Sequence, residues 1–174
     1  MDKIIESNLE DTIKNISIRG RMYYCSFCLK NAFEKNGIMN EEVKVILNTV
    51  LDFLESESLD LWEDVAKDIS PESILDENFN INDFTMDHNL IYKLKSFYKN
   101  IPGYLVELIE YTIYVGLENL YGGTGEYSPS TLDYILRIIS ICEQNGINIP
   151  DINHFLKYSF KEYHGWGNLI KLEK

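Results

Sequence analysis

Two of the three cysteines, Cys25 and Cys28, have the C-x-x-C spacing found in thioredoxin-type redox sites and in zinc sites. A structural zinc ion needs a second pair of ligands, and no such pair occurs in the sequence. A redox site of this type lies between a strand and a helix, whereas apolar residues recur here at the three- and four-residue spacing of a helix. Because unpaired cysteine is among the most buried residue types, we predict that Cys25, Cys28 and Cys142 are core residues.

A glycine-rich segment, residues 122–125, precedes an expected helix, and helix N-termini can bind phosphate groups. The segment lacks the lysine of a Walker motif and Glu126 would repel a phosphate, so we interpret it as a flexible connection. A second glycine-rich segment, residues 163–168, contains Trp166, whose ring we expect to pack near residues 104–125 and to fix the C-terminus. If the two segments meet, one pocket could be lined by Glu126, Tyr127, His164 and Trp166.

The acidic, asparagine-rich loop at residues 76–83 places oxygen-bearing side chains at alternate positions, as calcium loops do. An EF-hand loop requires glycine at its sixth position and glutamate at its twelfth, and Ile81 and Asp87 occupy those places. The three histidines also lack metal-ligand spacing. We therefore predict no metal site, no cofactor and, since no catalytic motif occurs, no catalytic residue.

Helical patterns extend along the chain, and these elements must position any site. Ser7 and Glu10 have the spacing of a capping box, Asn40 is a favourable N-cap, and Ser70 with Pro71 predicts the start of a short helix. Further helices are expected over residues 17–35, 41–54, 58–69, 88–100, 104–121, 128–145 and 151–160. The predicted fold class is all-α: residues 1–174 form a single compact domain of seven to nine helices around a largely buried central helix, residues 104–121.

Acidic residues are concentrated in about one quarter of the chain. Between Glu41 and Asp87 there are fourteen acidic residues and only two lysines, so this segment accounts for the formal net charge of −12. Such a surface attracts cations and basic proteins and repels nucleic acids and anionic membranes. The longest mostly apolar stretch, residues 101–115, is too short for a membrane span and contains two glutamates. The N-terminus has no signal-peptide pattern, so we expect a cytoplasmic protein.

The acidic residues of the expected helix at 58–69 lie away from its apolar stripe. Like charges four residues apart, as in Asp60 and Asp64, destabilise a helix by roughly 0.2–0.5 kcal/mol. Their presence favours a surface for a basic partner, although a face that only keeps the protein soluble explains the charge equally well. The predicted partner-binding residues are Glu55, Glu57, Asp60, Glu63, Asp64 and Asp68.

A compact, acidic, all-helical chain without a catalytic motif resembles the immunity proteins of bacterial polymorphic-toxin and contact-dependent inhibition systems. The segments Gly-Gly-Thr-Gly-Glu-Tyr-Ser-Pro at 122–129 and His-Gly-Trp-Gly-Asn at 164–168 are candidate signatures of that family. The resemblance implies non-enzymatic inhibition, in which the protein binds a cognate toxin, often a basic nuclease, and blocks its active site. Two other classes stay open: a helical enzyme or ligand-binding protein that uses the two glycine-rich segments, and a regulatory subunit that docks another basic protein.

Overall fold

Residues 2–172 are described by the structure, a computed structural model. Within this range the chain forms eight α-helices and three short 3-10 turns, with no β-strand, which confirms the predicted all-α fold of seven to nine helices. The helices are α1 (Asp2–Lys14), α2 (Ile18–Lys35), α3 (Glu41–Glu55), α4 (Leu59–Ile69), α5 (Pro71–Leu75), α6 (His88–Asn100), α7 (Gly103–Leu117) and α8 (Pro129–Gln144). The 3-10 turns are η1 (Ile81–Asp83), η2 (Ile152–Phe155) and η3 (Tyr163–Gly165).

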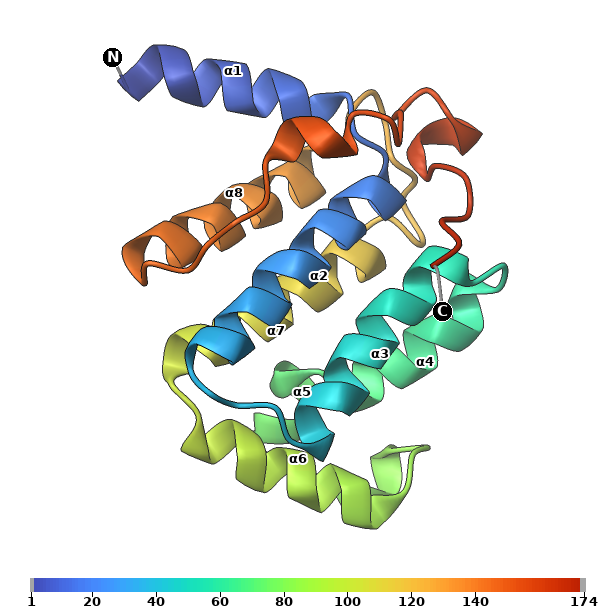
Figure 1. Ribbon diagram of the computed structural model, residues 1–174. Helices are drawn as coiled ribbons and strands as arrows, with labels where there is room; N and C mark the ends of the chain where they lie inside the picture. Colours follow the sequence, from blue (N-terminus) through green and yellow to red (C-terminus); the bar gives the residue numbers. More distant parts are fainter. Residues whose placement is uncertain (1, 173–174) are drawn as a thin grey trace.

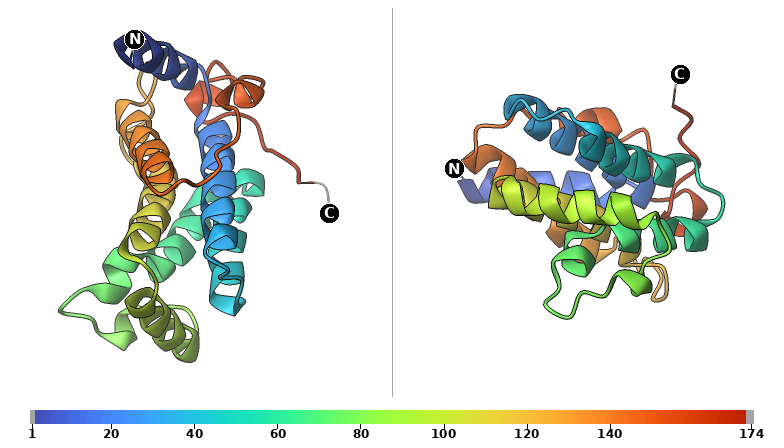
Figure 2. Two further views of the ribbon diagram at one scale, coloured as in Figure 1. Left: turned by 60° about the vertical axis from the view of Figure 1, so that its left-hand side comes forward. Right: turned by 90° about the horizontal axis from the view of Figure 1, so that it is seen from below.

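α2 lies in the middle of the molecule and packs against α7, α3 and α8 (Figure 1). α4 packs against α3, and α5 connects α4 to α6. α1 crosses one end of this arrangement and α6 crosses the other, as two further views show (Figure 2). The chain after α8 returns past α2 and ends beside α3, where Ile170 N donates a hydrogen bond to Leu54 O at 2.9 Å. The C-terminal segment therefore lies next to the α3–α4 connection.

α2 contributes more buried residues to the hydrophobic core than any other helix, and α3, α7 and α8 contribute equal numbers. The expected central helix is α7, which ends at Leu117 and exposes only Gly103 and Glu107. α2 is equally central, because it contacts three long helices and buries two arginines, Arg19 and Arg21. Within residues 2–172 no helix combines the length and the hydrophobicity that a bilayer span requires.

Two helices start where the sequence predicts, each with a side-chain cap, of which only the cap at Asn40 was itself predicted. Ser17 Oγ accepts a hydrogen bond from Gly20 N at 3.2 Å, and Asn40 Oδ1 accepts one from Val43 N at 3.1 Å. Such caps satisfy amides that lack an acceptor within the helix. The capping box predicted at Ser7 is wrong: α1 begins at Asp2 and continues through residue 10, because the same residue spacing is also compatible with a helix interior.

The helix predicted over residues 151–160 is also wrong, since only the short turn η2 forms there. The chain instead pairs with the α1–α2 connection. Ser17 N donates to Tyr158 O at 2.8 Å, and Phe160 N donates to Asn15 O at 2.9 Å. These backbone groups are used in the pairing, so they are not available for helical hydrogen bonds.

α4 is fixed by Trp62. The indole Nε1 donates to Thr49 O of α3 at 2.7 Å, and the ring centroid lies 4.7 Å from that of Phe53. Gly116 of α7 makes room for this ring, because a Cβ at that position would overlap Trp62. One side of α4 is thereby held against the core, while Asp60 and Asp64 on the helix remain exposed.

The three cysteines are buried and free, which confirms the prediction that they are core residues. Burial raises the pKa of the Cys25 thiol, because a thiolate there would lose its hydration. Cys25 is therefore held in the unreactive thiol form.

Candidate functional site

Four of the six predicted partner-binding acids lie on the surface: Glu55, Glu57, Asp60 and Asp64. They follow one another along the end of α3, the α3–α4 connection and α4. None of the four forms an ion pair with a side chain in the part of the chain that the structure describes. Their negative charge therefore faces solvent without an internal counter-charge.

Glu63 does not belong to this open surface, which corrects the prediction. The residue is only 5% exposed. Its carboxylate forms an ion pair with Lys67 and accepts a hydrogen bond from Tyr121 Oη at 2.7 Å. The hydrogen bond from Lys67, followed by that from Tyr121, lowers the pKa of Glu63, although burial alone would raise it. Glu63 thus joins α4 to the segment after α7.

Asp68 is the second correction, because it is only 7% exposed. Its Oδ2 accepts three hydrogen bonds: from Thr85 N at 2.7 Å, from Thr85 Oγ1 at 2.7 Å and from Met86 N at 2.8 Å. These bonds tie α4 to the loop that precedes α6. Asp68 is a structural anchor on that side, and the helical period alone did not reveal the loop that covers it.

The two glycine-rich segments do meet. Thr124 Oγ1 donates a hydrogen bond to His164 O at 2.6 Å. Gly165 lies so close to Thr124 and Phe160 that a Cβ at this position would overlap both side chains. The two segments are therefore in contact, which the sequence alone left open.

Their meeting does not produce the expected set of pocket residues. Trp166 lines a pocket at this place, but Glu126, Tyr127 and His164 do not contribute to it. Glu126 and His164 are exposed, and the carbonyl oxygen of Tyr127 accepts a hydrogen bond from Arg21 Nη2 at 2.7 Å. Trp166 itself is half-buried. It therefore combines packing against the domain with an accessible part of the ring.

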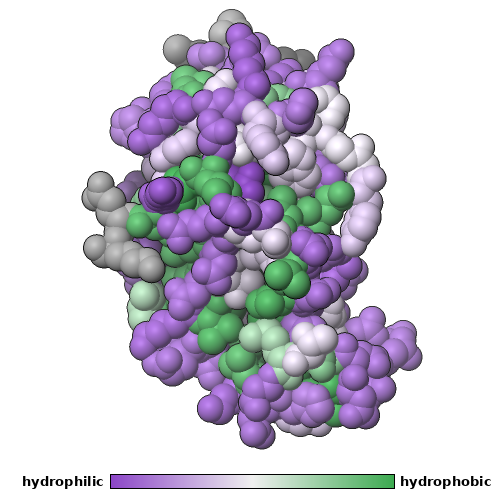
Figure 3. Space-filling view, turned by 90° about the vertical axis from the view of Figure 1, so that its right-hand side faces the viewer, coloured by the Kyte–Doolittle hydropathy of each residue, from purple (hydrophilic) through white to green (hydrophobic). Residues whose placement is uncertain are grey.

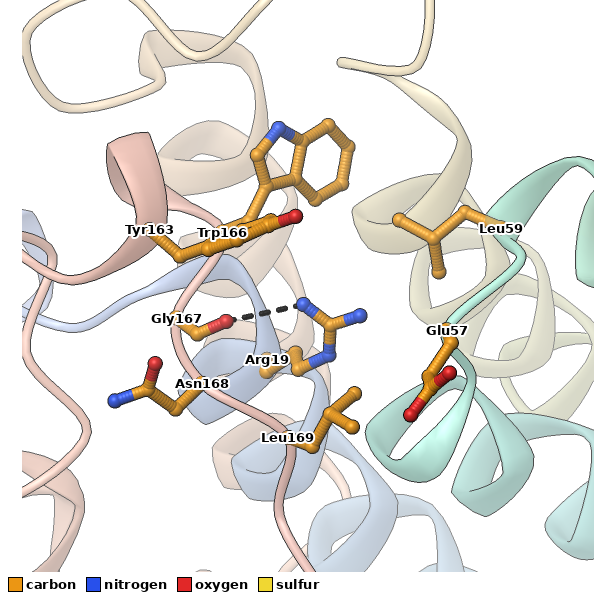
Figure 4. Close-up of a pocket in the computed structure, with 8 residues that line it drawn as sticks. All are labelled: Arg19, Glu57, Leu59, Tyr163, Trp166, Gly167, Asn168 and Leu169. Atoms are coloured by element: carbon orange, nitrogen blue, oxygen red, sulfur yellow. Dashed lines mark hydrogen bonds between the residues drawn. The ribbon is translucent and has the colours of Figure 1, made fainter.

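The pocket has a volume of about 520 Å³ and lies between the C-terminal segment, the start of α2 and the α3–α4 connection. Figure 4 shows Arg19 between two sets of side chains: Tyr163 and Trp166 of the C-terminal segment, and Glu57 and Leu59 of the α3–α4 connection and the start of α4. Its volume falls within the range of small-molecule sites. The lining residues are Arg19, Glu57, Leu59, Tyr163, Trp166, Gly167, Asn168 and Leu169. One of the exposed acids, Glu57, thus lines the same pocket as the C-terminal segment, although the two were predicted as alternative binding surfaces.

Arg19 is the polar centre of this pocket and was not among the predicted site residues. It is 4% exposed, and its Nη1 and Nη2 donate to Gly167 O at 3.0 Å and to Ser56 O at 2.8 Å. Its buried Nε has no hydrogen-bond partner. Burial lowers the pKa of Arg19, and nearby Tyr163 partly opposes this effect. The only sequence signal for its burial is its place between the apolar residues of a helix start.

The C-terminal segment is held in place by the backbone on both sides of the pocket. Arg19 N donates to Trp166 O at 3.0 Å, and Ile170 N donates to Leu54 O. Leu172 N donates to the Glu55 carboxylate at 2.9 Å. The guanidinium of Arg19 also lies 5.7 Å from the centroid of the Phe53 ring, a cation–π distance. The pocket walls are therefore ordered parts of the fold.

Several apolar side chains around this site are unusually exposed. Tyr163 is 70% exposed and Leu61, which lies on α4 between Asp60 and Asp64, is 66% exposed. Figure 3 shows the face that carries the α3–α4 connection and η3, with hydrophobic surface in its middle bordered by hydrophilic side chains. Exposed apolar groups with a polar border are typical of protein interaction sites.

Of the residue types that take part in acid–base or nucleophilic catalysis, the pocket lining contains Glu57 and Tyr163 but no serine, cysteine, histidine or lysine. In the part of the chain that the structure covers, no three His, Cys, Asp or Glu side chains come together as metal ligands. No protein-family model matches the chain, and neither the curated proteins nor the solved structures contain a significant match.

Proposed function

We propose that the protein is a non-enzymatic, immunity-type binding protein that neutralises a basic bacterial toxin domain. The observation that carries the proposal is the joint surface formed by the exposed acids Glu57, Asp60 and Asp64 and the pocket at Trp166. Glu57 belongs to both parts, since it is an exposed acid and lines the pocket. One partner can therefore contact the charge and the aromatic residues together.

The two parts supply different contributions to binding. Tryptophan and tyrosine, here the half-buried Trp166 and the exposed Tyr163, are among the residue types that supply most of the binding free energy at protein interfaces. The surrounding carboxylates attract a basic partner and accelerate its diffusional encounter. Since Asp60 and Asp64 have no internal ion pair, a partner's lysines and arginines do not have to displace one.

Affinity purification of the tagged full chain from its native host, followed by mass spectrometry, identifies the partner. We expect a basic protein in a stoichiometric complex that loses its toxic activity on binding. If the chain alone turned over a substrate at enzyme-like rates, or if the captured partner were acidic, the proposal would be wrong.

Association kinetics then test the acidic surface. In the variant Glu57→Gln/Asp60→Asn/Asp64→Asn the association rate should fall on the order of tenfold at low salt, with a flatter salt dependence. The matched control is Glu34→Gln/Glu107→Gln/Glu143→Gln, which removes the same charge from exposed sites on α2, α7 and α8. Equal slowing in both variants would assign the effect to net charge alone, and no slowing in either would leave the acids a role only in solubility.

A small-ligand-binding function is the second candidate, because the pocket contains a buried guanidinium with an unpartnered Nε. A site of this kind suits an anionic or carbonyl-bearing molecule. Native mass spectrometry of the protein from its host distinguishes the two functions. A bound small molecule that is lost in Arg19→Met would favour the ligand-binding function. A protein that carries no small molecule but binds a protein partner would support the first proposal.

A further inference from the structure

Arg19 carries a buried positive charge that no carboxylate of the described residues neutralises by an ion pair. The residue is 4% exposed and lines the pocket at Trp166. Burial lowers the pKa of Arg19, and the neighbour that opposes this effect is Tyr163 rather than a carboxylate. Buried charges in proteins are normally paired, so this pocket contains a cation whose counter-charge is missing from the described part of the chain.

The guanidinium of Arg19 also has unused hydrogen-bond donors. Arginine carries five N–H groups, and only two of those of Arg19 have an acceptor among the described residues, Gly167 O and Ser56 O. Nε is one of the others, but it is buried and cannot be reached from the pocket. The remaining two N–H groups belong to Nη1 and Nη2, one on each nitrogen. Figure 4 shows this end of the side chain directed toward the space between Trp166 and Leu59, so a group in the pocket has two neighbouring donors available.

The charge and the walls of the pocket select the kind of anion. Glu57 lines the pocket and the chain has a formal net charge of −12, so a phosphate group with two negative charges would be repelled. A carboxylate has a single charge, and its two oxygens match two neighbouring N–H groups of a guanidinium. Leu59 and Leu169 offer apolar contacts to the carbon atoms that bear the carboxylate. The pocket therefore suits a carboxylate at the end of a short aliphatic chain.

The surroundings of the pocket favour a protein as the source of this carboxylate. Tyr163 on the pocket wall is 70% exposed, and Leu61, two residues beyond Leu59, is 66% exposed. The backbone at Tyr163 and His164 has φ values of +45° and +55°, which are unfavourable for residues other than glycine. The fold thus tolerates strain where it presents Tyr163 to solvent. A free molecule inside the pocket would leave Leu61 exposed, whereas a protein surface covers both side chains together.

We propose that the pocket at Trp166 receives an aspartate or glutamate side chain of the basic partner, an inference that rests on the proposed function. This carboxylate accepts hydrogen bonds from Nη1 and Nη2 of Arg19, while the exposed acids Asp60 and Asp64 contact the partner's lysines and arginines. The two kinds of charge pair have opposite polarity, so together they fix the orientation of the partner. A basic protein without this acid would cover Arg19 and leave its charge unpaired, so the pair also contributes to specificity.

The signals of the two tryptophan indole groups test the pocket in the full chain without the partner. The probe is N-acetyl-glutamate N-methylamide, and the corresponding glutamine compound is its uncharged control. We expect the glutamate compound to cause a saturable chemical-shift change of the Trp166 indole and to bind at least about threefold more tightly than the glutamine compound. The Trp62 indole is an internal control, because its Nε1 donates to Thr49 O in the core.

Substitutions of two lining residues should change probe binding in opposite directions. Arg19→Met should abolish saturable binding of the glutamate compound. Because that variant also loses stability, Glu57→Gln provides a second measurement: it retains Arg19 and removes a like charge, so the glutamate compound should bind about twofold more tightly. Asp60→Asn is the matched control, since Asp60 is an exposed acid that does not line the pocket. Equal effects of Glu57→Gln and Asp60→Asn would place the probe outside the pocket and contradict the inference.

Double-mutant cycles with the captured partner identify the acid. Each aspartate and glutamate of the partner is replaced by its amide and combined with Arg19→Met. We expect one of these acids to be coupled to Arg19 by about tenfold or more in affinity. An unshifted Trp166 indole, equal binding of the glutamate and glutamine compounds, or the absence of a coupled acid would overturn the inference. Probe binding without a coupled acid would assign the pocket to a free carboxylate ligand instead.

The measurements with the partner also separate this inference from the proposed function. If the Glu57/Asp60/Asp64 variant slows association while no acid of the partner is coupled to Arg19, the inhibitor function stands and the carboxylate pocket fails. If no basic partner is captured, both fail.

Discussion

Two arginines at the start of α2, Arg19 and Arg21, occupy opposite kinds of surroundings. Arg21 is fully buried, and its guanidinium donates five hydrogen bonds, whereas Arg19 donates two from its side chain and leaves Nε without a partner. Neither is paired with a carboxylate in the described part of the chain. The acceptors around Arg21 are Ile13 O, Ile16 O, Tyr127 O, Ser128 O and Thr131 Oγ1, at 2.6–3.0 Å.

The difference separates a group used for folding from one available for binding. The acceptors of Arg21 come from the α1–α2 connection and the start of α8, so its guanidinium joins segments more than one hundred residues apart. Burial lowers the pKa of Arg21 to about 10, and five acceptors offset the lost hydration. Arg19 has an incomplete set of acceptors and lines a pocket. Nε itself is buried, so a partner in the pocket can act only through the other N–H groups of Arg19, whereas it can add nothing at Arg21.

Replacing Arg21 should have the largest effect on stability. Arg21→Met removes five hydrogen bonds at once, although Ile13 O and Ser128 O keep a backbone donor, and we expect the free energy of unfolding to fall by about 3–5 kcal/mol. Urea denaturation monitored by circular dichroism measures the change. Arg137→Met is the control, because Arg137 is exposed and its guanidinium contacts only surface groups, an ion pair with Asp133 and the ring of Tyr111, among the described residues. A loss at Arg21 no greater than at Arg137 would contradict a structural role for the buried guanidinium.

Moving the C-terminal segment away from Arg19 should have an intermediate effect. Gly167 has φ +81° and packs on Ser17, which a Cβ would overlap, so Gly167→Ala should cost about 2–4 kcal/mol. Gly123→Ala is the matched control: its φ is +71° but nothing lies within 4 Å of the added Cβ. Thermal unfolding of both variants separates the cost of the backbone conformation from that of the contact. Similar losses would show that the close approach at Gly167 contributes little.

The smallest change in stability is expected at Arg19. Arg19→Met removes two hydrogen bonds to carbonyl oxygens but also a desolvated charge, so we expect a loss of about 1–2 kcal/mol. Affinity for the partner should fall more than this loss of stability explains, because Met cannot donate to a group in the pocket. Isothermal titration with the captured partner provides the measurement. Unchanged affinity would place Arg19 with Arg21, as a residue used only for folding.

Local signals predicted the parts of the fold that depend on neighbours in sequence. Ser17 and Asn40 can cap their helices because the backbone amides that donate hydrogen bonds to their side chains lie only three residues further along the chain. The burial of Glu63 and Asp68 depends instead on Tyr121 and Thr85, which belong to other elements. The helical period places both acids away from the apolar stripe of α4, and it contains no information about what covers them.

The candidate site was predictable only in part for the same reason. Trp166 and Glu57 were each singled out from the sequence, yet nothing local indicated that they line one pocket. Their meeting depends on Arg19, whose backbone and side chain hold Trp166 O and Gly167 O. It also depends on the pairing of Ser17 with Tyr158, which replaced the expected last helix. Long-range backbone pairing therefore explains why the helix predicted over residues 151–160 does not form and why the pocket lies where it does.

The make-up of the pocket also has a consequence for the order in which parts of the fold form during synthesis. Five of its eight lining residues, from Tyr163 to Leu169, are translated after all eight helices. A nascent chain can gather its core on the ribosome, but it has no pocket until this segment leaves the exit tunnel and closes a loop of more than one hundred residues onto Arg19. The pocket therefore forms only after all eight helices have been translated. A protease cut just after η2 would remove it first, while the helices remain.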